Sequence, residues 1–357
     1  MAQNMNFSYP ALKTFCTDAF LKFGFTEEES KIIVDVLLTS DLYGIESHGM
    51  QRLVRYHKGI EKGLIKVNAK PEIVFETPVS AVIDGHDGMG QLMGHKAMEI
   101  AIEKAKKTGM AIVTVRNSNH YGIAGYYAQM ASKEGLIGLS MTNSEAIMVP
   151  TFGRKAMLGS NPIAIAMPAE PYDFFFDAST TVVTRGKLEV YNKMEKPLPE
   201  GWALNKDGNA STDAADVLTN ISAHVGGGIM PLGGNTERNG SHKGYGYGMI
   251  CEIFTSILSM GLPSNHTYIE GRGGVCHGFI AIVYLTRRPS GHCNRGLYRE
   301  RLNEWPSSGY RTAGLFHISL LSRAEGNLGI RTADEHSVNY QVKKKKRRIL
   351  FELNQGL

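Results

Sequence analysis

Two histidines in this 357-residue sequence lie beside residues that could support proton transfer. The first, His48, is followed by Arg52 and Arg55, and at helical spacing the three side chains share one side of a helix. Two guanidiniums could hold a carboxylate beside the imidazole, because a guanidinium pairs with a carboxylate through parallel hydrogen bonds. Ser47 could fix the orientation of the ring. The alternative is an ordinary solvated helix face.

The second histidine, His120, ends a polar loop at residues 117–120. Apolar stretches flank this loop at residues 110–115 and 136–141, and we predict both to be strands covered on two faces. His120 would then follow the carboxyl end of a strand and precede a short helix, a position where ligands and anions bind in α/β sheets. The alternative is a polar residue that caps the loop.

Two further places could bind parts of a dinucleotide. Asp177 follows a predicted strand at residues 174–176, where a carboxylate could accept hydrogen bonds from ribose hydroxyls or, alternatively, cap a helix. Glycine-rich residues 226–234 lead to Lys243, at the start of a predicted apolar helix over residues 247–260. Free amides at that helix start, together with one lysine, suit a cofactor phosphate.

The surrounding pattern predicts an α/β protein with a helical amino-terminal region. Helices are expected at residues 8–24, at 26–44 behind a Thr26–Glu29 capping box, and at 47–63 with Ser47 as the N-cap. Two short strands follow within residues 71–84, and residues 191–225 form a polar excursion. We predict a helical domain over residues 1–75, a cofactor-binding and substrate domain over 76–283, and an atypical tail over 284–357.

The glycines at residues 88–94 follow a predicted strand and precede a helix, as in a dinucleotide-binding Rossmann turn. No acidic residue ends the next strand, where Arg116 and Asn117 stand instead. We therefore interpret these glycines as turn-formers.

Composition is that of an ordinary globular protein, with 42% hydrophobic and 20% charged residues. No apolar run reaches the roughly 20 residues that a membrane span needs, and no targeting signal opens the chain, so we expect a cytoplasmic protein without membrane contact. Residues 1–283 hold 25 basic against 28 acidic residues, which argues against a nucleic-acid partner. Four scattered cysteines indicate reduced, mostly buried thiols, and the histidine spacing indicates neither a metal site nor a metal hydrolase.

Three passages together resemble the type-2 malate/L-lactate dehydrogenase family, which also holds ureidoglycolate, sulfolactate and diketogulonate oxidoreductases. They are residues 44–49 (Gly-Ile-Glu-Ser-His-Gly) with Arg52 and Tyr56, residues 116–122 (Arg-Asn-Ser-Asn-His-Tyr-Gly), and residues 231–234 (Pro-Leu-Gly-Gly) followed by residues 242–244 (His-Lys-Gly). The likeness covers roughly residues 5–282.

The resemblance implies a non-Rossmann fold, a homodimer, and hydride transfer between NAD or NADP and a small 2-hydroxy or 2-keto carboxylate. It implies that His48 or His120 transfers the proton, with Ser47 beside His48, and that Arg52 binds the substrate carboxylate. Either histidine fits this role. Cofactor binding is implied for His120, Tyr121, Gly122, Ile123, Ala124, Ser144, Ser160, Asp177, Ala178, Ser179, Arg185, Gly186 and Lys243. Some members carry an aspartate after the Arg-Gly pair, where this chain has Lys187, so a relay through that position is not expected.

The tail departs from the family. Fourteen Lys and Arg against six Asp and Glu lie in residues 284–357, without an apolar period. Our hypothesis is that a frameshift or a misjoined reading frame replaced the native carboxyl terminus. It leaves open a second function, a catalytically inactive nucleotide-binding relative. A basic targeting or nucleic-acid patch at residues 343–348 is the rival interpretation of the tail.

Overall fold

The computed structural model describes residues 4–169, 172–268, 271–284 and 337–341. Backbone contacts divide the chain into two units between Asn68 and Ala69, and residues 337–341 belong with the first unit. The remaining part of the predicted tail, including the basic residues 343–348 and Cys293, lies outside the described residues.

The first unit begins with two helices whose ends follow the sequence signals. α1 (Tyr9–Lys22) starts after Ser8, whose hydroxyl accepts a hydrogen bond from the Ala11 amide. α2 (Glu27–Leu42) carries the predicted capping box, in which Thr26 and Glu29 bond to each other's backbone amides. The backbones of β1 (Asn4–Ser8) and β12 (Ser337–Gln341) pair antiparallel.

The predicted helix over residues 47–63 is wrong at its start. Two 3₁₀ turns, η1 (Glu46–His48) and η2 (Met50–Arg52), precede α3 (Leu53–Glu61), and Ser47 is not an N-cap. Gly49 separates the two turns in an extended conformation, with φ −85° and ψ −151°. The helix therefore begins only at Leu53, beyond the residues that were expected to share a helix face.

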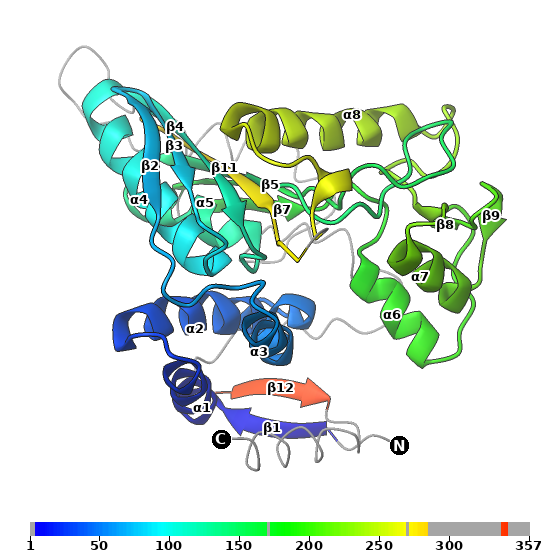
Figure 1. Ribbon diagram of the computed structural model, residues 1–357, viewed down its shortest axis with the longest axis horizontal. Helices are drawn as coiled ribbons and strands as arrows, with labels where there is room; N and C mark the ends of the chain where they lie inside the picture. The colour runs from blue at the N-terminus through cyan, green and yellow to red at the C-terminus, as the bar shows by residue number, and fades with distance from the viewer. Residues whose placement is uncertain (1–3, 170–171, 269–270, 285–336, 342–357) are drawn as a thin grey trace. The chain divides into compact units, whose positions relative to one another are not determined.

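The second unit is built on a seven-stranded mixed sheet (Figure 1). β3 and β4 are parallel, and every other neighbouring pair is antiparallel, so the sheet is mixed α/β and not of the Rossmann type, as predicted. The strand order is β2 (Glu72–Thr77), β3 (Ser80–Asp84), β4 (Met110–Ser118), β11 (Val275–Ile282), β5 (Ile137–Thr142), β6 (Ile163–Met167) and β7 (Phe174–Ala178).

Helices cover both faces of this sheet (Figure 1). α4 (Gly90–Thr108) and α5 (Ala124–Lys133) pack on one face, and α8 (Ser241–Glu252) with the π-helical segment η3 (Ile253–Ile257) packs on the other. Alternation along β11 separates the faces, because Phe279 lies beside Gly94 of α4 whereas a Cβ at Gly278 would meet the Phe254 carbonyl of η3. α8 starts at Ser241, earlier than the predicted residue 247, and a 3₁₀ turn η4 (Ser264–His266) follows η3.

Residues 191–225 are not a polar excursion, which corrects the prediction. α6 (Arg185–Lys193) and α7 (Ala214–Ala223) pack together with a small sheet of β8 (Ala203–Leu204), β9 (Ala210–Ser211) and β10 (Gly228–Ile229). Their apolar side chains are few but meet in one buried cluster of Ile147, Val183, Leu188, Leu198, Ala203, Ala214, Val217, Ile221 and Ile229. Within the described ranges, no helix combines the length and apolar character that a bilayer crossing requires.

Candidate functional site

In the first unit, the two 3₁₀ turns bring Ser47, His48 and Arg52 together. The Ser47 hydroxyl lies 2.9 Å from Nδ1 of His48, and Nε of Arg52 donates a hydrogen bond to the Ser47 carbonyl. All three side chains are half-buried. Ser47 thus contacts the imidazole through its hydroxyl and the guanidinium through its backbone carbonyl.

Asp41 fixes the turns that carry this group. Its carboxylate accepts a 2.8 Å hydrogen bond from the Met50 amide, and a Cβ at Gly49 would lie 1.8 Å from Oδ1 of Asp41. Only glycine therefore fits between the two turns. Sequence reasoning missed Asp41, although an acid among the apolar residues near the end of the helix expected over residues 26–44 was a usable signal, and the structure shows that it is buried.

The environment of His48 favours its neutral form. Desolvation lowers its pKa to about 3, and the positive charges of Arg52 and Arg55 act in the same direction. At neutral pH the imidazole is therefore uncharged, and one of its ring nitrogens carries no proton.

In the second unit, the loop after β4 places His120 at the start of α5. The Gly122 amide lies 3.4 Å from Nδ1 of His120, and the buried Asn119 donates to the carbonyls of Asp87 and Gly88 at 2.9 and 3.1 Å. A Cβ at Gly90 would lie 2.5 Å from the His120 carbonyl. The glycines at residues 88–94 thus allow α4 to approach the His120 loop closely.

Asp177 meets the other end of the same loop. Its Oδ2 accepts a 2.7 Å hydrogen bond from the Gly125 amide in the first turn of α5, although 52 residues separate the two in sequence. Desolvation raises the pKa of Asp177 to about 6, and the Gly125 amide opposes this increase. The structure therefore brings the predicted cofactor residues 120–124 next to Asp177.

Ser144 and Ser160 also come together. The Ser160 amide donates to the Ser144 hydroxyl at 3.1 Å, and the two hydroxyls lie 3.4 Å apart. The Ser160 carbonyl accepts from the Thr180 amide at 2.9 Å, and the Thr180 carbonyl accepts from the Leu232 amide at 2.9 Å. These hydrogen bonds join the segments around residues 144, 160, 180 and 232.

Arg185 is held at one side of this set. It contacts Glu145 at 3.0 Å and Ser222 at 3.0 Å, and Gly186 follows it in the first turn of α6. Ser179 donates to the Thr181 carbonyl at 3.1 Å, and Ala178 ends β7. Of these four predicted cofactor residues, Arg185 is bonded to Glu145, which follows Ser144 in the chain, and Ala178 and Ser179 lie at the end of β7 and just after it.

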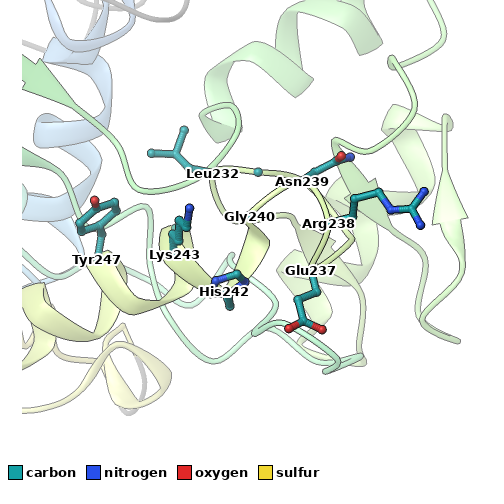
Figure 2. Close-up of a pocket in the computed structure, with 10 residues that line it drawn as sticks. Leu232, Glu237, Arg238, Asn239, Gly240, His242, Lys243 and Tyr247 are labelled. Atoms are coloured by element: carbon teal, nitrogen blue, oxygen red, sulfur yellow. The ribbon is translucent and has the colours of Figure 1, made fainter.

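Lys243 lies in an open groove of about 310 Å³ at the start of α8. Figure 2 shows Lys243 beneath Leu232 with Tyr247 one turn along the helix, while the guanidinium of Arg238 points away from them. The expectation of free amides here is wrong for two residues, because the Ser241 and Lys243 amides already donate within the loop. The exposed side chain of Lys243 then offers the groove a cation for an anionic ligand.

The donor set of the second unit fits a dinucleotide. Asp177 offers an acceptor for hydroxyl groups, Ser144 and Ser160 offer small polar side chains, and Lys243 offers a cation. A Cβ at Gly244 would lie 2.3 Å from the Leu232 carbonyl, so only glycine allows this close packing beside Lys243. His48 and Arg52 belong to the first unit and His120 to the second, so their common action on one substrate stays a prediction.

The cysteine prediction holds for three of four residues. Cys16, Cys251 and Cys276 are free and buried, and burial raises the pKa of Cys16 and Cys276 to about 12. In the part of the chain that the structure describes, no cluster of three or more His, Cys, Asp or Glu side chains could hold a metal ion.

Comparisons with known proteins agree with this fold. Malate dehydrogenase from Pyrococcus abyssi (strain GE5 / Orsay) is 48% identical over 273 residues, 76% of this chain and 74% of its own. Ureidoglycolate dehydrogenase (NAD(+)) from Escherichia coli (strain K12) is 31% identical over 307 residues, 84% of this chain and 82% of its own. The crystal structure of malate dehydrogenase from Entamoeba histolytica superposes with a TM-score of 0.80 at 36% identity, covering 88% and 87% of the two chains.

These likenesses define an oxidoreductase of the dehydrogenase class that acts on CH–OH donors, as the resemblance implied. Residues 7–297 match the family model described as malate/L-lactate dehydrogenase. The chain belongs to the malate/L-lactate dehydrogenase family. The match continues past residue 282, where the likeness was expected to end, to residue 297.

Proposed function

We propose that this protein transfers a hydride between NAD or NADP and C2 of a small 2-hydroxy or 2-keto carboxylate of the malate or L-lactate type, as a homodimer. Family membership carries the proposal, and the contact of Ser47 with His48 beside Arg52 supports it. A relative whose name specifies NAD(+) supports a nicotinamide cofactor. The cytoplasmic location stays a prediction.

The nicotinamide ring supplies the hydride chemistry when it is bound, and the protein supplies position and charge. Lys243 would hold a phosphate, and Asp177 would accept hydrogen bonds from a ribose. Ser144, Ser160 and the loop of residues 120–124 would line the remainder. This assignment is supported by the contacts that join these segments in the second unit.

Arg52 would bind the substrate carboxylate. Its Nε is engaged by the Ser47 carbonyl, which orients the guanidinium plane relative to His48. A carboxylate bound there would offset the positive charge that helps to lower the pKa of His48. Substrate binding would thus remove the part of the downward pKa shift that comes from the arginines, while desolvation, its larger cause, would remain.

In the oxidative direction, His48 or His120 would accept the hydroxyl proton at a ring nitrogen. The neutral state of His48 suits this role, and Ser47 would orient its ring through Nδ1. His120 would do so from the loop at the start of α5, where the Gly122 amide lies near Nδ1. Both histidines are candidates for the proton transfer.

The test is oxidation of NADH or NADPH with pyruvate, oxaloacetate and other 2-keto acids, followed by absorbance. His48→Ala or His120→Ala should lower turnover by roughly 10²-fold, the scale of lost general acid–base catalysis. His57→Ala on α3 and His95→Ala on α4 serve as controls, because each removes an imidazole that lies beside a glutamate one turn along its own helix and has no part in the proposed mechanism. Full activity in both His48 and His120 variants would remove the mechanism.

The second function, an inactive nucleotide-binding relative, is supported by the composition of residues 284–357. It predicts binding of reduced cofactor, seen by fluorescence titration, without turnover of any 2-keto acid. Turnover by the full chain with either cofactor would exclude it. Translating the neighbouring frames of the gene without finding an acidic, helix-forming continuation would count against the frameshift hypothesis.

A further inference from the structure

The central strand of the sheet contains a histidine to which no role has been assigned. His277 lies on β11, is fully buried, and faces the same side of the sheet as Phe279. β11 runs antiparallel to both β4 and β5, so these two strands end at the same edge of the sheet. His120 follows the end of β4, and Ser144 follows the end of β5.

His277 bonds to the last residue of each of these strands. Its Nε2 lies 2.9 Å from the Ser118 hydroxyl, and its Nδ1 lies 2.8 Å from the Thr142 hydroxyl. Ser118 is fully buried and Thr142 is 6% exposed, so water cannot replace either bond. The pairing of β11 with β4 shifts register between Val275 and His277, and such an irregularity re-aims a side chain next to a site.

The directions of the two hydrogen bonds follow from the neighbouring carbonyls. The Thr142 hydroxyl donates to a carbonyl, with Asn143 at 2.8 Å and Cys276 at 3.0 Å, so Nδ1–H of His277 donates to Thr142. Nε2 of His277 then accepts a hydrogen bond from the Ser118 hydroxyl. The Asn119 carbonyl, which could accept from the same hydroxyl, lies farther away, at 3.5 Å. A neutral imidazole satisfies both bonds at once.

The ring of His277 also supports the His120 loop by stacking. Tyr121 lies parallel to it, with ring centroids 4.3 Å apart and an interplanar angle of 9°. Tyr121 stacks in turn on Tyr127 of α5 at 4.7 Å. The imidazole of His277 therefore contacts the chain on both sides of His120. It hydrogen-bonds to Ser118 and stacks on Tyr121.

We propose that His277 is a positioning residue that sets the His120 loop and the Ser144 loop in register with each other. It acts through Ser118, Tyr121 and Thr142 and does not itself contact the substrate. This inference rests on the proposed function, because the two loops carry its candidate proton-transfer and cofactor residues.

The test compares His277→Phe with Phe279→Leu. The first variant keeps a ring beside Tyr121 and removes both hydrogen bonds. The control removes packing from the same face of the same strand, where Phe279 contacts Tyr121 and Tyr127, without removing a hydrogen bond. His277→Phe should lower kcat about 10- to 100-fold, the effect of misplaced catalytic groups, and leave KM for the 2-keto acid within about threefold.

Phe279→Leu should keep kcat within about threefold even when its melting midpoint falls as far as that of His277→Phe. His277→Gln, which retains a donor and an acceptor, should recover part of the lost kcat. Equal kcat in His277→Phe and Phe279→Leu would overturn the inference and leave the proposed function standing.

Hydrogen exchange provides a readout that does not depend on activity. Amides of residues 118–122 and 142–145 should exchange about tenfold faster in His277→Phe than in Phe279→Leu, because the loops lose their common anchor. If the wild-type chain shows no turnover, the proposed function fails and this comparison still decides the positioning role. Equal exchange in the two variants would overturn it.

Discussion

Asp177 is expected to destabilise the unliganded protein, and its replacement by asparagine tests this directly. The pKa of Asp177 rises from 3.8 to about 6 because the carboxylate is desolvated against α5. The folded state therefore favours the protonated form. The cost of holding the charge is absent below pH 3.8, grows as the pH rises toward about 6, and is complete above it.

The size of this cost follows from the pKa difference. At about 1.4 kcal/mol per pH unit, it amounts to about 3 kcal/mol at neutral pH. The side chain is half-buried, so screening by solvent reduces the figure, and we expect Asp177→Asn to stabilise the protein by about 1–3 kcal/mol. Asparagine can still accept the Gly125 hydrogen bond. The melting midpoint should rise by roughly 3–10 °C for a unit of this size.

Calorimetry at about pH 7.5 and about pH 4.5 measures the stability of Asp177→Asn relative to the unaltered protein. The stabilisation at the lower pH should be less than half of that at the higher pH. Asp173→Asn is the control, because it removes an equal charge just before β7, where the Asp173 carboxylate accepts a hydrogen bond from the Ser132 hydroxyl of α5. An equal stabilisation at both pH values, or no stabilisation, would refute the reasoning.

Asp177→Asn should also weaken NADH binding roughly 10- to 100-fold, as loss of a hydrogen bond to a charged group does.

Two further predictions concern charge. Lys243→Met should weaken NADH binding in a fluorescence titration by about tenfold at low salt, with a smaller difference at high salt, whereas Lys206→Met on an exposed turn should leave the affinity unchanged. Desolvation lowers the pKa of His277 to about 3, so the folded state binds fewer protons than the unfolded chain between about pH 3 and 6.5 and loses stability as the pH falls through that window. The free energy of unfolding, measured with urea, should fall by up to about 3 kcal/mol through this group between pH 6.5 and about pH 4.5. The His277→Phe variant should lack this part of the pH dependence. If the free energies of the two proteins changed in parallel with pH, the prediction would be contradicted.

Local signals in the sequence were sufficient for much of the fold. The capping box of Thr26 and Glu29 and the strand over residues 136–141 were predicted within a residue or two. Each depends on side chains a few positions apart, whose interactions exist in any chain that adopts the local conformation. Two predictions failed for lack of long-range information. The helix that was expected from Ser47 starts later because the Met50 amide donates to the carboxylate of Asp41, nine residues before Met50. Residues 191–225 form a core only together with residues from elsewhere in the chain.

The sequence by itself determined which residue types are present and the family to which they belong. Only the tertiary structure decided their ionisation states and their neighbours in space. A pKa depends on burial and on charges brought close by folding, so Asp177 beside Gly125 and His48 beside Arg52 and Arg55 acquire values that sequence spacing does not carry. His277 stands in an apolar strand of the sequence, and its link to Ser118 and Thr142 arises because antiparallel pairing places three distant segments side by side.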